Sequence, residues 1–245
     1  MNRPRTQKGF TLIELLVVIG IIALLASIAV PAFTGVQIRA AQTKSLSNAK
    51  QIGLCCKQFA IDNNGQYPSY VVQSGNNGST TNGSGSTPTP VQDANSAFAQ
   101  LFPTYISTIQ IFFQPKSAWT PAQLQDPNMA NASTQTAPWP LNKGANEWAY
   151  VVGLYDTSNS SFPLIANGFV SGGQQSHQYT NIETLPGGVW KGQQAIVVFC
   201  DDSAKVIRCN TQYMVPGGPD NQDLFETSQA QAGWLSNTQT VVNPL

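Results

Sequence analysis

Residues 8–30 read KGFTLIELLVVIGIIALLASIAV, and this stretch decides how the rest of the chain is organised. From Phe10 to Val30 the only ionisable side chain is Glu14, while residues 1–9 carry three basic side chains and no acid. At about 1.5 Å per residue, a helix of this length matches a bilayer core of about 30 Å. The basic start predicts that residues 1–9 stay in the cytoplasm and that the chain beyond the apolar run crosses the membrane.

Glu14 is the unusual residue of this stretch, because a charged side chain at mid-bilayer costs roughly 2.5 to 3.5 kcal/mol on insertion scales. Such a charge predicts a partner that neutralises it. A cleaved secretory signal and a plain signal anchor are two other interpretations of the basic start and the apolar run. A secretory signal usually has a shorter apolar region, of about 7 to 15 residues, and lacks an acid. A plain anchor gives no reason for Glu14.

Residues 8–15 resemble the class III signal of type IV pilin-like proteins, the family of pilins and type II secretion pseudopilins. The resemblance implies that Gly9 is the last leader residue, cut by a prepilin peptidase, and that Phe10 becomes the N-methylated amino terminus. Glu14 and Pro31 stand where the family has these residue types. Glu14 would then pair with the free amine of a neighbouring subunit during filament assembly, because a buried ion pair left half made is very costly.

The helix is expected to continue beyond the membrane as an amphipathic segment over residues 31–62. Pro31 lacks an N–H group and is expected to break or kink the helix. It either marks the point where the helix leaves the lipid or lets the helix stretch within a filament. The side chains predicted to share one buried face recur at helical spacing: Ile38, Ala41, Ser45, Ala49, Ile52, Gly53, Cys56, Phe59 and Ala60.

A strong breaker cluster, Asp62-Asn63-Asn64-Gly65, predicts the end of the helix, with Gly65 available for a left-handed cap. Residues 48–54 and 59–68 resemble the helix end and first loop of major pseudopilins of the G type. The resemblance therefore covers about the first 68 residues, and it divides the chain into a leader (1–9), a transmembrane segment (10–30), an amphipathic segment (31–62) and a head (63–245).

The head is expected to be a globular periplasmic α+β domain, in which an antiparallel sheet packs on the long helix. Residues 72–96 are rich in Gly, Ser, Thr and Asn, which predicts a flexible polar loop. Short apolar stretches predict the strands and minor helical turns: 98–102, 109–113, 150–154, 162–170 and 195–199. The clearest hairpin joins 195–200 to 205–210 through a turn at 201–204.

Three later segments, 148–150, 162–169 and 195–203, resemble the C-terminal part of extended pseudopilin-like proteins. In those proteins a strand commonly leads into a D-G-H or D-G-S turn. Asp202 in place of the glycine is a departure from that pattern and puts any role of this turn in doubt.

Four cysteines are present, and an oxidising compartment would allow disulfides. In the hairpin register given above, Cys200 and Cys209 share a sheet face, but Cys200 opposes Lys205, so a direct bridge needs a register shift or a bulge. A helix-to-sheet disulfide from Cys55 or Cys56 is an alternative, and buried free thiols are another.

The sequence offers little support for catalysis or metal binding. His177 is the only histidine and lies in a polar loop without a nucleophile motif, and no phosphate-binding or zinc motif is present. A weak calcium candidate is formed by Asp220, Asp223 and Glu226, which lack the spacing of an EF-hand. The leader holds three of the 12 basic residues, so the mature chain has 9 basic and 12 acidic residues and a formal charge of −3. Nucleic-acid binding is not expected.

The sequence therefore predicts a structural, non-enzymatic subunit of a periplasmic pseudopilus filament of type II secretion, anchored in the inner membrane before assembly. The expected partners are a prepilin peptidase, other pilin or pseudopilin subunits, an inner-membrane assembly platform and the lipid bilayer. The presence of Glu14 argues against the tip type of subunit, which lacks this residue in the family. A type IV pilin for adhesion, motility or DNA uptake is the alternative within the family. A membrane-anchored binding protein that never polymerises is the alternative outside it.

Overall fold

A computed structural model gives the fold, and two compact units, Met1–Ala41 and Gln42–Leu245, divide the chain. Helix α1 (Leu12–Asp62) is one continuous element of 51 residues that begins in the first unit and ends in the second. The structure describes residues 10–72, 88–119, 141, 144–170, 177–218, 222–227, 234–236 and 238–244.

The C-terminal end of α1 lies where the breaker cluster predicts it. The amides of Asn63 and Gly65 both donate to the carbonyl oxygen of Ala60, at 3.0 and 2.8 Å. Asn64 and Gly65 have φ angles of +56° and +79°, the left-handed conformation in which a glycine carries no steric penalty. The prediction of the helix end is confirmed.

Pro31 does not break α1, which is continuous through this position, so of the two predicted effects the break is wrong and the kink stays a prediction. A proline holds φ near −65°, which fits a helix, and its missing N–H removes one helical hydrogen bond. The helical hydrogen bonds on either side suffice to carry the element through this position.

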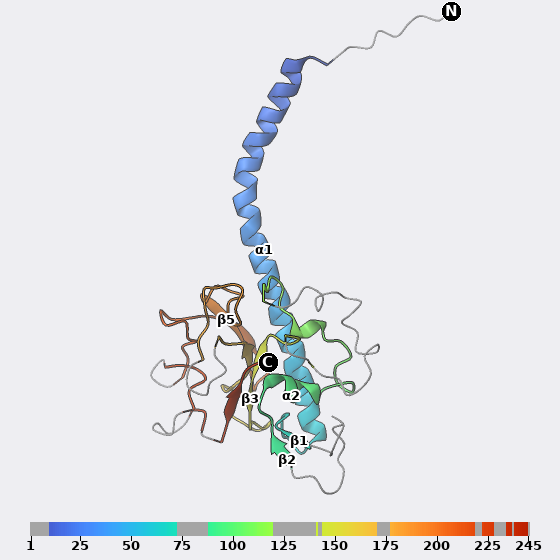
Figure 1. The fold of residues 1–245 in the computed structure, drawn as a ribbon, viewed down its shortest axis with the longest axis vertical. Coiled ribbons are helices and arrows are strands. Elements are labelled where there is room, and N and C mark those ends of the chain that lie inside the picture. The colour runs from blue at the N-terminus through green and yellow to red at the C-terminus, as the bar shows by residue number, and fades with distance from the viewer. Residues whose placement is uncertain are drawn as a thin grey trace, which may run out of the picture. The chain divides into compact units, whose positions relative to one another are not determined.

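The second unit is built on a five-stranded antiparallel sheet with the order β6-β5-β4-β3-β7. All residues of β3 and β4 are buried. Since an antiparallel sheet and a long helix make up the fold, the α+β expectation is confirmed (Figure 1). The strands are β3 (Trp148–Val152), β4 (Pro163–Asn167), β5 (Gln194–Phe199), β6 (Ala204–Arg208) and β7 (Thr240–Val242).

The amphipathic part of α1 packs on this sheet along the predicted face. Gly53 lies against β5, because a Cβ atom added there would lie 2.9 Å from Cγ1 of Val198. Two residues of the predicted face are not buried: Ile38 is 42% exposed, and Phe59 is half-buried. The buried residues of α1 in the second unit are Ser45, Asn48, Ala49, Ile52, Gly53, Cys56 and Ala60.

Two of the five apolar stretches, predicted to form strands with minor helical turns, form helical turns. Residues 98–102 comprise the last two residues of helix α2 (Ala94–Ala99) and the turn after it, and the side chain of Asp93 caps α2 by accepting the amide of Ser96 at 2.7 Å. Residues 109–113 contain a 3-10 helix, η1 (Gln110–Phe112). Their apolar side chains still enter the core, since Phe98 and Phe112 are fully buried.

The predicted flexible loop at 72–96 is too long at its C-terminal end. Strand β1 (Tyr70–Val72) pairs antiparallel with β2 (Pro88–Pro90), and α2 follows at Ala94. Residues 73–87 lie outside the described residues.

The β5–β6 hairpin has a different register from the predicted one. Val198 pairs with Ala204 and Val197 with Lys205, because the turn is tighter than expected and closes with the amide of Phe199 donating to the carbonyl of Ser203 at 2.9 Å. Cys200 therefore lies in the turn, whereas the amide of Cys209 bonds to Gln193 at the other end of the hairpin. Seven residues of strand, roughly 23 Å, separate the two cysteines along the sheet.

Candidate functional site

The first turn of α1 contains a reciprocal hydrogen-bonded pair, Thr11 and Glu14. The amide and the hydroxyl of Thr11 donate to Oε2 of Glu14 at 2.8 and 2.7 Å, and the amide of Glu14 donates back to the Thr11 hydroxyl at 3.3 Å. This is a capping box, which satisfies amides at a helix N-terminus. The Thr-x-x-Glu spacing is the sequence signal that predicts it, and the sequence interpretation above did not use it.

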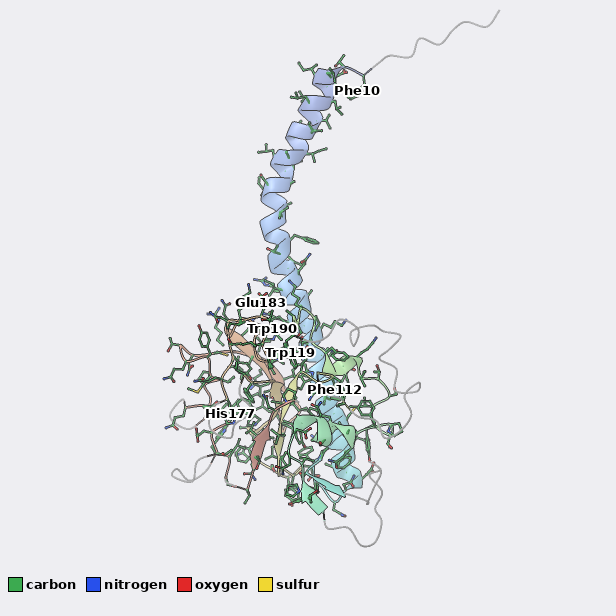
Figure 2. The ribbon with its side chains drawn as sticks, viewed as in Figure 1. Phe10, Phe112, Trp119, His177, Glu183 and Trp190 are labelled. Atoms are coloured by element: carbon green, nitrogen blue, oxygen red, sulfur yellow. The ribbon has the colours of Figure 1, made fainter. Side chains whose placement is uncertain are left out.

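The side chains around Glu14 are apolar and uncovered. Phe10, at the N-terminal end of α1 (Figure 2), is 72% exposed, and Leu12 and Ile13 are 88% and 70% exposed. Helix α1 is long and apolar enough to cross a membrane, by length and composition. An apolar surface of this extent needs lipid or other helices around it. Gly9, the predicted last leader residue, lies outside the described residues.

The turn after β5 contains the residue that departs from the family pattern. Asp202 has a φ angle of +62°, so it occupies a left-handed position where glycine is the residue without strain. Its Oδ2 accepts a bond of 2.7 Å from Nζ of Lys57 on α1. The hydrogen bond to Asp202 raises the pKa of Lys57. The substituted carboxylate thus ties the turn to the helix.

The structure shows all four cysteines as free thiols. Cys56 and Cys200 are buried, and burial is the main cause that raises the pKa of both, well above its usual value for Cys56 and to about 12 for Cys200. Burial also raises the pKa of Cys209 to about 12. Of the alternatives drawn from the sequence, this geometry agrees with buried free thiols.

His177 has an acidic partner that the sequence did not reveal. Its Nδ1 lies 2.8 Å from Oδ2 of Asp223, and the ring packs between Phe169 and Phe225, with centroids 5.2 and 5.7 Å away. Figure 2 shows His177 within the head. Since 46 residues separate the two partners, no local motif could predict the pair.

The weak calcium candidate is not assembled in the described residues. Both carboxylate oxygens of Asp223 are engaged, one by His177 and the other by the amide of Phe225 at 3.3 Å. Glu226 is exposed, and Asp220 lies outside the described residues. Within the described part of the chain, no group of three or more His, Cys, Asp or Glu side chains is placed to hold a metal ion.

Glu147 is a second buried acid, and no cation pairs with it among the described residues. Its Oε2 accepts the amide of Gln114, while its Oε1 has no hydrogen-bond partner. Burial raises the pKa of Glu147 to about 8, against the smaller lowering effect of its bonds from Ser117 and Gln114. This carboxyl is therefore largely neutral at pH 7.

Comparison with known proteins identifies the N-terminal segment. Residues 4–30 match the family model of the prokaryotic N-terminal methylation motif. The N-terminal segment is therefore similar to that of type IV pilin-like proteins. The matched residues include part of the basic start, Thr11 and Glu14, and the apolar run.

Relatives that match the N-terminal part of this chain are named either as pilins or as type II secretion proteins. The chain is 45% identical over 56 residues to the type IV major pilin protein PilA of Myxococcus xanthus. The matched residues make up 23% of this chain and 25% of that protein. Over 66 residues it is 40% identical to the type II secretion system core protein G of Aeromonas hydrophila, 27% of this chain and 46% of that one. A fimbrial protein of Neisseria meningitidis is 36% identical over 69 residues, 28% of this chain and 40% of that one.

The chain thus spans between a quarter and a half of the length of these curated relatives. No solved structure matches it significantly. The printed names of these relatives are those of a pilin, a fimbrial protein and a core protein of type II secretion. The apolar N-terminal helix and the methylation motif fit an anchor in the inner membrane.

Proposed function

We propose that this pilin-like chain is a structural subunit of a periplasmic pseudopilus filament of type II secretion, assembled through α1. Glu14 carries the proposal, because it is a carboxylate inside an apolar segment whose side chains are uncovered in the single chain. Lipid can cover the apolar side chains but cannot neutralise the charge. A neighbouring subunit that brings a cation can do both.

The proposed partner of Glu14 is the α-amine of a neighbouring Phe10, freed when a prepilin peptidase cuts after Gly9. Before assembly, the two bonds from Thr11 hold the Glu14 carboxylate at the helix N-terminus. The helix dipole favours an anion at that position. On assembly the amine adds the counter-charge, and only a neighbour in the right register places it there. Glu14 therefore selects the register of the filament.

Topology follows from the same segment. The basic residues of the leader keep it on the cytoplasmic side, so residues beyond the apolar run are proposed to lie in the periplasm. An assembly platform in the inner membrane would then extract α1 from the lipid as the subunit joins the filament. The action of the protein is mechanical, with no reaction catalysed.

A type IV pilin is the second candidate, because relatives with pilin and fimbrial names match the same segment as those named for type II secretion. Filaments that extend from the surface of native cells would favour the pilin. Filaments confined to the periplasm, together with a secretion defect on deletion of the gene, favour the pseudopilin.

Assembly in native cells tests the proposal. The wild-type chain is expected in the sheared or pelleted filament fraction, and Glu14→Ala is expected to remain in the membrane. Glu226→Ala, which removes an exposed acid of the head, is the matched control and should assemble normally. Wild-type and Glu14→Ala chains found equally in the filament fraction would contradict the proposed role of Glu14.

A further inference from the structure

A groove with a volume of about 420 Å³ opens within the head, between α1 and the segment that contains η1. Helix α1 contributes Lys44 and Asn48 to its lining, and the η1 segment contributes Ile111, Phe113 and Gln114. Figure 2 shows Phe112, the residue between two of these, beside the C-terminal half of α1. The groove combines an apolar floor with a lysine at its side.

Two polar side chains of this groove, Asn48 and Gln114, are buried and fixed by hydrogen bonds. Asn48 is buried and donates to the carbonyl of Phe113 at 3.3 Å. Gln114 is 2% exposed and donates to the carbonyl of Glu147 at 3.1 Å, while it accepts from Asn167 at 2.6 Å. Lys44 is exposed and forms no ion pair with any residue that the structure describes. The groove therefore offers one uncommitted cation on a rigid frame.

A surface of complementary chemistry lies at the far end of α1, and we call it the acidic end patch: Ile61, Asp62, Tyr155 and Asp156. Ile61 and Tyr155 are large apolar side chains that are 64% and 46% exposed, and both acids are exposed. The amide of Asp156 donates to the carbonyl of Gly65 at 2.8 Å, which holds the two halves of the patch together. Along α1, Asp62 lies about 27 Å from Lys44.

We propose that the groove at Lys44 receives the acidic end patch of a second copy of this chain. Lys44 pairs there with Asp62 or Asp156, and the exposed Ile61 packs on the apolar floor. Two different surfaces of one head make a heterologous contact, and such a contact repeats into an open helical filament when it does not close into a ring. The inference rests on the proposed filament function and adds to it the contact that joins the heads.

Charge reversal in the full-length chain, expressed with its native assembly machinery, tests this contact. Lys44→Glu and Asp62→Lys are each expected to lower the filament yield roughly fivefold or more, since an exposed pair contributes up to about 1 kcal/mol and reversal turns attraction into repulsion. The combination of Lys44→Glu with Asp62→Lys or with Asp156→Lys should restore the yield. Lys50→Glu, an exposed lysine of the same helix outside the groove, is the matched control and should assemble normally.

Different outcomes distinguish this inference from the function on which it rests. Normal filaments from Lys44→Glu would overturn the head contact alone. The head contact would also be overturned if Lys44→Glu lost its filaments and neither Asp62→Lys nor Asp156→Lys restored them. If the wild-type chain itself never enters filaments, the proposed function fails, and the head contact fails with it. Raised salt should lower the filament yield of the wild-type chain, because it screens the ion pair. At the same salt, the filament yield of the doubly reversed chain should remain above the yield of either single variant.

Discussion

Lys57 of α1 and Asp202 of the β5–β6 turn form an ion pair, with Nζ and Oδ2 2.7 Å apart. Asp202 makes this bond from a backbone conformation, φ +62°, that favours glycine. The chain thus accepts local strain of about 1 to 2 kcal/mol at this position. In return it gains a polar link between the helix and the hairpin.

Substitution of Asp202 separates these two effects. Asp202→Gly loses the ion pair and relieves the strain, so the free energy of unfolding should change by less than about 1 kcal/mol. Asp202→Ala loses the pair and keeps the strain, and it should destabilise the head by about 1 kcal/mol more than Asp202→Gly does. Urea unfolding of the full-length chain in detergent, followed by tryptophan fluorescence, measures both. A glycine variant that is less stable than the alanine variant would contradict this account of the turn.

The same turn shows where sequence reasoning succeeds and where it ends. The apolar run at 195–199 and its polar neighbours suffice to predict a hairpin, because strand and turn signals are local. The register is set by a turn that is tighter than predicted, in which Asp202 adopts a left-handed conformation that favours glycine. The Lys57 contact that ties this turn to α1 comes from 145 residues earlier in the chain, so a local pattern carries no information about it.

Gly53→Ala should destabilise the head, because the added methyl group would lie 2.9 Å from Cγ1 of Val198. Overpacking of this kind typically costs 1–3 kcal/mol. Gly35→Ala is the matched control: nothing lies within 4 Å of its added Cβ, and alanine is the better helix former. The double variant Gly53→Ala with Val198→Ala should recover part of the loss. Equal unfolding midpoints for Gly53→Ala and the wild type would show that the helix and β5 are not so closely packed.

Glu147 predicts how the stability of the head depends on pH. Its pKa is raised from 4.5 to about 8, so the folded state favours the neutral acid. Stability from this group is fully present below pH 4.5 and is lost as the pH rises from about 4.5 to 8. Glu147→Gln, which imitates the neutral form, should flatten that part of the profile, whereas the exposed Glu226→Gln should not. Parallel profiles for wild type and Glu147→Gln in urea unfolding would refute this assignment.

Buried polar pairs mark the limit of prediction within the head. The apolar positions of β3 to β5 follow from residue type, because burial of apolar surface drives folding. Glu147 with Gln114, and His177 with Asp223, are joined only by tertiary structure, and neither pair has a spacing that a motif describes. The capping box of Thr11 and Glu14 differs, since its three-residue spacing is visible in the sequence.

Thr11→Ala should weaken the first turn of α1, because it removes a hydroxyl that makes two hydrogen bonds. This hydroxyl donates to the Glu14 carboxylate and accepts a hydrogen bond from the Glu14 amide. Loss of an N-cap side chain typically costs about 1 kcal/mol. Amide hydrogen exchange of residues 11–15 in detergent micelles should become faster in Thr11→Ala and remain unchanged in Thr11→Ser, which keeps the hydroxyl. Unchanged exchange in Thr11→Ala would show that the capping box does not hold the helix end.

The buried thiols should resist alkylation in the folded chain, and all four thiols should be alkylated in the unfolded chain. Cys56 and Cys200 are buried with raised pKa values, so iodoacetamide should modify them only after denaturation. Cys55 and Cys209 are only half-buried and should react before the other two. Mass spectrometry after denaturation without reductant should find four alkylated cysteines. Fewer than four would mean that a disulfide forms in the cell.

The most direct test of a processed filament subunit is mass spectrometry of this chain in the filament fraction of native cells. The account predicts a chain that lacks residues 1–9 and begins at Phe10 with a methylated amine, ready to pair with Glu14 of a neighbour. A chain that begins at Met1 and is recovered from membranes but not from filaments would contradict it.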